Sequence, residues 1–388
     1  MLVTGQRAEI EWEQTAEYFG FEDGELFGVS LSISDDGNTF LAGAYEHSSE
    51  FSSGGRIEMI DTKFELGIEA LGQADNDAFG FSVSMSGNTE TVAAIRTSDG
   101  VLEVFDENFD LRQEIDAGFV SFTAVFRVSR DGNWIVIAGD EQIDSRKNAM
   151  KAKVYQFDEK SLLFVQYGND IEIQMNSDFG SYMIDTTDDG SQFVVTAIGD
   201  MQFSQTGSFW VFERKDSPEK YVLMGEQVVS KATNDGFGQA VNIAVTDDDE
   251  VIVAIGIPFE GRVVVFMYTD GSWVVHVEID AGPEYNPDSD FGYAVSLSRN
   301  GSRIAIGARC YAEPSSDGCD GAVQAYDIIG QKIFPAGSIL AGPPFSFFGE
   351  AVAISSDGNA IAVGAPEDCI DSECSGSVYL FVAREVEP

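Results

Sequence analysis

Short runs of alternating apolar and small residues recur along the whole chain, each opened by a phenylalanine and closed by a tight-turn signal. Seven such runs begin at Phe27, Phe79, Phe122, Phe179, Phe237, Phe291 and Phe348. Period-two alternation is typical of β-strands, and the Asp-Gly or Asn-Gly pair that follows most runs tolerates the positive φ angles of a hairpin. Each copy therefore predicts a first strand that turns directly into a second.

The rest of each copy predicts two further strands. The second strand is a short apolar run closing on small residues, as in IAIGA from Ile304 and IAVGAP from Ile361. After a variable loop, a third strand starts at Gly and ends on an aromatic residue, as in GRVVVF from Gly261. A more polar fourth strand follows, for example WVVHVEI from Trp273. Four strands per copy without helical periodicity predict antiparallel sheets.

Successive copies are 52, 43, 57, 58, 54 and 57 residues apart, which is in the range of propeller blades. Radial repetition hides the edges of such sheets. We therefore predict an all-β fold, a single seven-bladed β-propeller domain spanning residues 1–388, with four antiparallel strands per blade. The last copy ends after its third strand at Phe381, whereas Ala8–Trp12 lie where a fourth strand is expected. Residues 1–26 are predicted to complete the last blade and close the ring.

These repeats resemble the FG-GAP repeat family, which forms the seven-bladed propeller of integrin α subunits. The resemblance extends from Phe27 to Phe381 and is strongest in the last copy, FGEAVAISSDGNAIAVGAP from Phe348. The second and third copies are degenerate, with Thr123 in place of a Gly and no GAP. The resemblance implies adhesion or ligand binding on the upper face of the propeller.

Integrin-type repeats often carry a calcium loop between the first and second strands, and this chain departs from that pattern. Its tight turns lack room for the six or more oxygen ligands that calcium prefers, so we expect no cofactor and no metal requirement for folding. Only the hairpins Asp185–Gly190 and Thr246–Glu250 are longer or more acidic. They could bind calcium or be exposed acidic turns, and the candidate ligands are Asp185, Asp188, Asp189, Asp247 and Asp249.

The formal net charge of −44 comes from 66 acidic and 22 basic residues. Such a surface repels phosphate backbones and anionic headgroups, so we expect no nucleic-acid partner. No stretch approaches the roughly 18 apolar residues that cross a bilayer, so we expect no direct membrane insertion. A solubilising surface and a cation-binding face are both compatible with this charge.

Four cysteines lie in the last fifth of the chain as two close pairs. Their spacing does not match the CxxC knuckles of zinc sites, so we predict disulfides Cys310–Cys319 and Cys369–Cys374. Disulfides indicate an oxidising compartment, and hence a secreted or cell-surface location. No signal peptide is visible near the start of the sequence, so we expect a mature chain or an ectodomain excised from a larger polypeptide.

The longest loops join second to third strands and are expected on one face, together with the loops between blades. They are Tyr45–Gly54, Asp140–Asn148, Gly199–Thr206, Cys310–Asp320 and Glu367–Ser375. Loops on a rigid scaffold carry function, so this loop face is the leading candidate site. Aromatic residues within such loops anchor proteins or stack on sugars, or they fold back onto blade edges. The candidate ligand-binding residues are Tyr45, Phe51, Phe203, Phe259 and Tyr311.

An acidic residue recurs one or two places before the opening phenylalanine, and its repetition favours a structural role as an acceptor of backbone N–H groups. The residues are Glu25, Asp77, Asp178, Asp235 and Asp290. A ring of these carboxylates attracting a cation is the alternative.

Catalysis has little support, because the chain has only two histidines, His47 and His276, and no motif pairs either of them with a nucleophile. We expect not an enzyme but an extracellular-type binding or adhesion module that recognises a protein or glycan through the loop face. A carboxylate-dependent glycoside hydrolase and a structural spacer of a larger surface protein are the alternatives.

Overall fold

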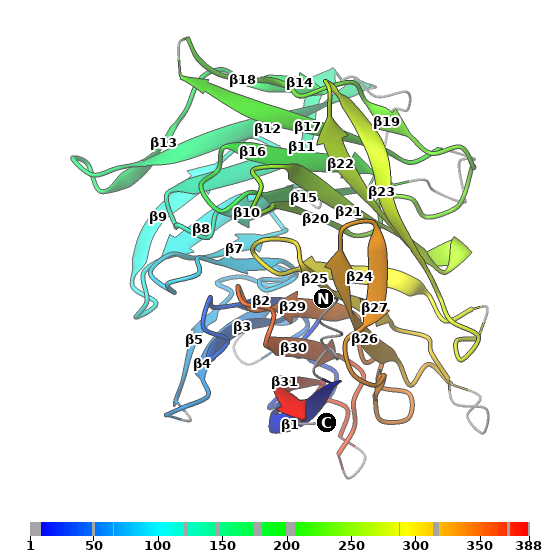
Figure 1. Cartoon of the computed structure of the whole chain (residues 1–388). Helices are drawn as coiled ribbons and strands as arrows, with labels where there is room; N and C mark the ends of the chain where they lie inside the picture. The colour runs from blue at the N-terminus through cyan, green and yellow to red at the C-terminus, as the bar shows by residue number, and fades with distance from the viewer. Residues whose placement is uncertain are drawn as a thin grey trace.

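The computed structural model describes residues 9–48, 51–64, 66–119, 123–144, 147–173, 181–198, 206–216, 218–286, 288–312, 318–370 and 373–386. Within these residues the strands form seven antiparallel sheets arranged around a central axis (Figure 1). Helical structure in the described ranges is limited to the 3-10 turn η1 (Pro258–Glu260). None of the described residues belongs to a helix long and apolar enough to cross a membrane. The predicted seven-bladed β-propeller is confirmed.

Each blade is numbered here by the repeat that opens it, and its strands run in chain order from the axis outwards. Blade 1 contains β2 (Ser30–Ile33), β3 (Thr39–Ala44), β4 (Arg56–Asp61) and β5 (Leu66–Leu71). Blade 2 contains β6 (Val83–Met85), β7 (Val92–Arg96), β8 (Val101–Phe105) and β9 (Leu111–Asp116). Blade 5 contains β20 (Val241–Val245), β21 (Val251–Ile257), β22 (Arg262–Thr269) and β23 (Ser272–Asp280).

Three blades differ from the prediction because their outer strand is split into two pieces that both pair with the third strand. Blade 3 contains β10 (Val125–Val128), β11 (Trp134–Asp144), β12 (Lys147–Asp158), β13 (Leu163–Gln166) and β14 (Ile171–Ile173). Blade 4 contains β15 (Tyr182–Thr186), β16 (Gln192–Ala197), β17 (Ser208–Asp216), β18 (Glu219–Leu223) and β19 (Val228–Val229). Blade 6 contains β24 (Phe291–Leu297), β25 (Arg303–Ala308), β26 (Ala322–Ile329), β27 (Lys332–Pro335) and β28 (Leu340–Ala341). The breaks coincide with Gly168, Gly225 and Gly337, whose positive φ angles of 71°, 76° and 86° are incompatible with an extended strand.

Blade 7 is assembled from both ends of the chain, as predicted. It contains β29 (Ala351–Ile354), β30 (Ala360–Ala365), β31 (Ser377–Val386) and, as its outer strand, β1 (Glu9–Phe19). Strand β1 runs antiparallel to β31, from Glu9 opposite Val386 to Phe19 opposite Ser377 (Figure 1). The closing strand is longer than the predicted Ala8–Trp12 segment, of which Ala8 lies outside the described residues. The indole of Trp12 is buried and donates a hydrogen bond to the Ala336 carbonyl of blade 6 at 2.6 Å.

The recurring Phe-Gly pair holds neighbouring blades together. The Phe27 ring is fully buried, and Gly28 has a φ of 89°, a conformation that favours glycine. A Cβ added to Gly364 in the second strand of blade 7 would meet the Gly28 carbonyl oxygen, so adjacent backbones approach too closely for a side chain. The same close approach to a glycine carbonyl of the next blade occurs at Gly43, Gly256 and Gly307, so blade packing requires glycine at this position of these four second strands.

Candidate binding site

The inner strands of the seven blades surround a central channel that holds two neighbouring cavities. The lower cavity, of about 110 Å³, lies towards the hairpins that join first and second strands. The upper cavity, of about 370 Å³, lies towards the loop face. Leu31, Arg127, Val295 and Val352 line both.

The lower cavity is lined by one structurally equivalent residue from each inner strand. These residues are Ser32, Ser84, Arg127, Asp185, Asn242, Ser296 and Ala353. Five of them accept a hydrogen bond from a backbone N–H of the next blade. The five bonds run from Met85 N to Ser32 Oγ (3.1 Å), Val128 N to Ser84 Oγ (3.0 Å), Ile243 N to Asp185 Oδ2 (2.8 Å), Leu297 N to Asn242 Oδ1 (2.7 Å) and Ile354 N to Ser296 Oγ (3.1 Å). The ring thus satisfies N–H groups on the exposed edges of the inner strands and joins the blades.

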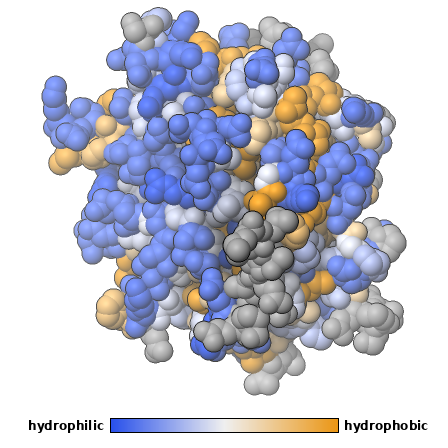
Figure 2. All heavy atoms as spheres, in the orientation of Figure 1, coloured by the Kyte–Doolittle hydropathy of each residue, from blue (hydrophilic) through white to orange (hydrophobic). Residues whose placement is uncertain are grey.

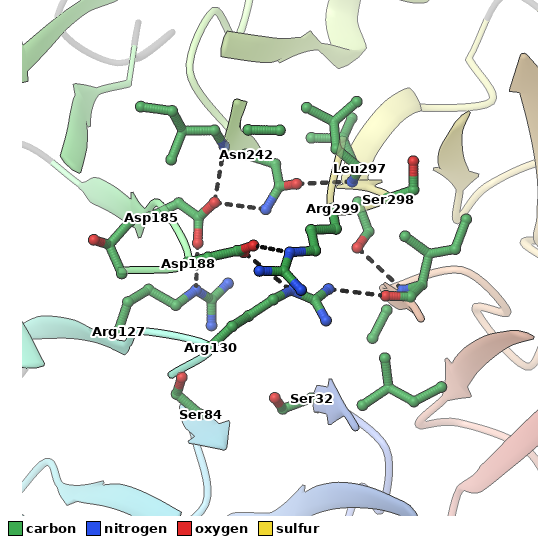
Figure 3. A pocket seen from close by; sticks show the side chains of 18 of the residues that line it. Ser32, Ser84, Arg127, Arg130, Asp185, Asp188, Asn242, Leu297, Ser298 and Arg299 are labelled. Carbon is green, nitrogen blue, oxygen red and sulfur yellow. Dashed lines mark hydrogen bonds and ion pairs between the residues drawn. The ribbon is translucent and has the colours of Figure 1, made fainter. Parts of the chain in front are cut away.

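Ion pairs between hairpins cross the lower end of the channel (Figure 3). Arg130 of blade 3 lies 2.7 Å from the Asp35 carboxylate of blade 1 and 3.7 Å from that of Asp188 in blade 4. Arg299 of blade 6 lies 2.5 Å from the other oxygen of Asp188. Burial raises the pKa of Asp188, and the two guanidinium groups oppose this shift. These contacts tie together hairpins that are distant in sequence.

Asp185, in the ring of residues from the inner strands, is likewise a carboxylate paired with an arginine. Its Oδ1 lies 3.3 Å from Arg127, and its Oδ2 also accepts the Asn242 amide at 2.6 Å. Burial raises the pKa of Asp185, with Arg127 opposing the shift. Two of the five calcium candidates, Asp185 and Asp188, are therefore engaged by arginines.

The remaining calcium candidates lie in hairpin turns. Asp189 Oδ1 accepts the Ser191 N–H at 2.9 Å, Asp247 Oδ2 accepts the Asn300 amide at 3.1 Å, and Asp249 occupies a turn position with a φ of 61°. Among the described residues there is no group of three or more His, Cys, Asp or Glu side chains that could hold a metal. Whether these hairpins bind calcium or are only acidic turns is not tested by the structure.

The upper cavity opens between residues that lie two places after the opening phenylalanine of their repeats. These residues are Val29, Phe81, Gln239, Tyr293 and Glu350. The Phe81 side chain is 54% exposed, and its ring makes an edge-to-face contact with Tyr45 at 5.4 Å between centroids. We call this opening the upper mouth.

Tyr293 and Glu350 belong to a second cluster that lines the upper mouth. The Arg309 guanidinium lies 3.7 Å from the centre of the Tyr293 ring and forms ion pairs with Asp290 (3.0 Å) and Glu350 (3.2 Å). Burial raises the pKa of Glu350, while Arg309 and the Tyr293 hydroxyl act in the opposite direction. This cluster is a half-buried, charged wall in which Arg309 pairs with both carboxylates.

Carboxylates dominate the electrostatics around Tyr45. Burial raises the pKa of the Tyr45 hydroxyl, and the negative charges of Glu46, Glu350 and Glu367 raise it further. Carboxylates near an open aromatic pair create a negative potential that attracts cations. The upper mouth is thus chemically suited to a cationic group.

The predicted aromatic candidates have different positions. Tyr45 lines the upper mouth, Phe51 is half-buried, and Phe259 in η1 is 45% exposed. Tyr311 is buried against Tyr285 at 5.3 Å, as in the alternative of a ring folded back onto the blade. Phe203 lies outside the described residues.

The sequence analysis did not identify Phe81, Tyr293, Glu350 and Arg309, because it sought aromatic ligand-binding residues only in the long loops. Three of them share the position two places after the opening phenylalanine, and comparison of this position among the repeats could have identified them.

The carboxylates before the opening phenylalanines serve mainly as structural acceptors, as predicted. Glu25 accepts the Phe21 N–H at 2.6 Å, Asp77 accepts the Gln73 and Ala74 N–H groups at 2.9 and 2.8 Å, and Asp235 accepts the Phe237 N–H at 3.0 Å. Asp290 instead pairs with Arg309 at the upper mouth. Asp178 lies outside the described residues.

Both predicted disulfides are present, Cys310–Cys319 in blade 6 and Cys369–Cys374 in blade 7. The second one also supports ring closure. Cys374 N donates to Asp23 Oδ1 and its carbonyl accepts the Gly24 N–H, both at 2.8 Å. The blade 7 loop is thereby attached to the segment that leads from β1 into blade 1.

Comparison with known proteins supports the fold and the repeat. Residues 343–381 match the model of the FG-GAP repeat. A search of curated proteins found no significant match. Among solved structures, the β-propeller domain of Cps50 (Swd1) from Myceliophteria thermophila is 9% identical, covers 95% of this chain and 99% of its own, and superposes with a TM-score of 0.56.

Two enzymes or putative enzymes have similar folds. A putative 6-phosphogluconolactonase from Bacteroides uniformis is 13% identical, with coverage of 84% and 88% and a TM-score of 0.56. An oligogalacturonate lyase in complex with manganese is 9% identical, with coverage of 98% and 99% and a TM-score of 0.53. At such identities these proteins share only the fold with this chain. The chain is therefore a seven-bladed β-propeller that carries the FG-GAP repeat, matched directly at residues 343–381.

Proposed function

We propose that this propeller is an extracellular, non-enzymatic binding module that recognises a protein through its loop face and takes a basic side chain of that protein into the upper mouth. The observation that carries the proposal is the open Phe81–Tyr45 aromatic pair, with the carboxylates of Glu46 and Glu367 nearby and the carboxylate of Glu350 shared with Arg309. An ammonium or guanidinium group over an aromatic ring contributes about 0.5–2 kcal/mol, more when it is desolvated.

Exposed apolar side chains elsewhere on the loop face favour a protein over a single sugar. Phe21 is 64% exposed, Phe345 61% and Ile370 43%, and all three lie in connections that open on this face. Figure 2 shows hydrophobic residues in separate patches on a largely hydrophilic surface. Dispersed aromatic and aliphatic anchors within a polar surface are typical of protein interfaces.

The proposed location rests on the two disulfides, because such bonds persist in oxidising compartments. Both lie in loops that shape the proposed binding face. An extracellular module with a negative face would associate fastest with positively charged partners, and salt would slow that association.

The pairing of two of the carboxylates around the upper mouth disfavours glycoside hydrolysis. A hydrolase needs one carboxyl group as acid and a second as base or nucleophile. Here Arg309 bridges Asp290 and Glu350, so both are held in ion pairs. His47 is also engaged, with its Nδ1 2.6 Å from the buried Glu25 carboxylate. These groups are placed for structure and charge.

A displayed library of random peptides, panned at low and high salt, tests the proposal. We expect enrichment of peptides rich in Lys or Arg, and a loss of affinity of about fivefold to thirtyfold in Phe81→Ala, since truncating an interface anchor costs about 1–2 kcal/mol. Phe64→Ala is the matched control, because Phe64 is 70% exposed in the hairpin between β4 and β5 of blade 1 and does not line the upper mouth.

Four results would contradict the proposal. Peptide enrichment without basic residues, or equal binding by wild type and Phe81→Ala, would remove the upper mouth as the site. Binding to a glycan microarray through Phe81 would replace the protein ligand by a glycan. Turnover of glycoside substrates that is lost in Glu350→Gln would support the hydrolase alternative.

A further inference from the structure

Six of the seven hairpins between first and second strands contain the same side-chain turn. An Asp or Asn oxygen accepts the backbone N–H two residues further on, at 2.9–3.2 Å. The residues are Asp36, Asn88, Asp131, Asp189, Asn300 and Asp357. Because four of the six are aspartates, the turn needs only a side-chain oxygen, as is general for such turns.

Asn300 differs from the other five in the residues that follow it. Asn300-Gly301-Ser302 is an Asn-x-Ser acceptor sequence for N-linked glycosylation, and it is the only Asn-x-Ser/Thr triplet in the sequence. The second turn asparagine, Asn88, is followed by Thr89 and Glu90 and does not form this triplet. One hairpin of the propeller is thus chemically distinct from its equivalents.

The two polar atoms of the Asn300 side chain have separate partners. Oδ1 accepts the Ser302 N–H at 3.1 Å and the Ser302 hydroxyl at 2.7 Å. Nδ2 donates to Asp247 Oδ2 at 3.1 Å, and within the described residues this is its one hydrogen bond. An amide N–H₂ has two donors, so one remains for substitution without disturbing the turn.

Residues around the Asn300 side chain are exposed to solvent. Ser302 and Asp247 are exposed, and the neighbouring Arg299 side chain is 63% exposed. Asn300 itself is half-buried, and Gly301, with a φ of 67°, is buried against Ile252 of blade 5. The site lies at the end of the inner strands opposite the upper mouth, since each first strand begins at the loop face and ends at this hairpin.

We propose that Asn300 carries an N-linked oligosaccharide. In the transfer, a bond forms between Asn300 Nδ2 and the anomeric carbon of an N-acetylglucosamine. The bond from that carbon to the pyrophosphate oxygen of a lipid-linked oligosaccharide donor breaks, the amide loses one proton, and the lipid pyrophosphate leaves. The remaining N–H keeps its hydrogen bond to Asp247. This inference rests on the extracellular location proposed above.

A glycan at this position covers the lower face and leaves the loop face open to a ligand. The modification and the proposed binding are therefore independent of each other. Removal of the glycan is expected to leave peptide affinity at the upper mouth unchanged.

The test is secretion of the chain from eukaryotic cells behind a cleavable signal peptide, followed by peptide-N-glycosidase treatment in ¹⁸O-labelled water and mass spectrometry. Trypsin cuts at Arg299 and Arg303, so a chymotryptic digest gives the more useful peptide. We expect Asn300 to be converted to labelled aspartate, and the intact mass to fall by one oligosaccharide.

Matched variants separate modification from folding. Asn300→Asp retains the turn oxygen found in four other blades and Ser302→Ala removes the acceptor hydroxyl, so both are expected to be secreted without a glycan. Ser302→Thr and Asn88→Asp are expected to keep it. Secreted wild-type protein with both disulfides formed and Asn300 unmodified overturns this inference alone. A glycosylated protein without affinity for basic peptides overturns the proposed function alone.

Discussion

The two ends of the channel are built from the same seven inner strands and have opposite properties. At the lower end, Ser32, Ser84, Asp185, Asn242 and Ser296 each accept an N–H from the next blade, and arginines neutralise the buried carboxylates. At the upper mouth, the equivalent position in successive repeats holds a different kind of side chain, and Phe81 is half-exposed. At the lower end, five of the seven equivalent side chains share the role of accepting an N–H group, whereas at the upper mouth no such shared role recurs and the side chains are left to form a surface for binding.

Removing a lower-end carboxylate is expected to have the largest effect on stability. Asp185→Ala leaves the Ile243 N–H without an acceptor and Arg127 without its counter-ion, for a loss of about 3 kcal/mol in the free energy of unfolding. Urea unfolding followed by fluorescence measures this loss. Asp247→Ala, at an exposed hairpin position, is the control and is expected to change stability by less than about 0.5 kcal/mol. Equal losses in both variants would show that the lower ring does not hold the blades together.

A smaller effect is expected from two serines that lie two residues apart in blade 2. Ser84 accepts the buried Val128 N–H, so Ser84→Ala is expected to cost about 1–3 kcal/mol. Ser82 lines the upper mouth, and Ser82→Ala is expected to cost less than about 0.5 kcal/mol. Both variants replace a serine hydroxyl by hydrogen, one at each end of the channel. Thermal unfolding therefore compares the stability lost at the two ends for the same chemical change. A similar melting temperature for both would contradict the division into a structural and a binding half.

The sequence was sufficient to predict the ring because its repeated residues report constraints that every blade shares. The buried Phe27 and the positive φ of Gly28 recur in most copies, and the unpaired third strand at Phe381 required a partner from the other end of the chain. The upper mouth could not be predicted in this way. Its key contact joins Tyr45 of blade 1 to Phe81 of blade 2, two residues that no motif relates.

The aromatic candidates in the loops also show what the sequence could not predict. Tyr311 and Tyr45 both occupy loops between second and third strands, yet Tyr311 is buried against Tyr285 and Tyr45 lines the upper mouth. Tertiary packing decides between these outcomes, because an aromatic ring in a loop gains free energy wherever it finds apolar surface. The sequence also did not predict that the outer strands break at Gly168, Gly225 and Gly337, because the breaks depend on the positive φ angles of these residues.

The smallest expected effect is a pH dependence at the wall of the upper mouth. Burial raises the pKa of Glu350, although Arg309 and Tyr293 oppose the shift and Asp290 adds to it. The folded state then holds the proton to higher pH than the unfolded chain does, so the stability contributed by this group declines as pH rises through the window above its ordinary value near 4.5. In Glu350→Gln this contribution is absent. The stability of wild type relative to Glu350→Gln is therefore expected to decrease between pH 4 and pH 7, as measured by urea unfolding at each pH. A difference that stays constant, or that increases with pH, would mean that the ion pair with Arg309 outweighs burial, and that the charged carboxylate itself stabilises the upper mouth.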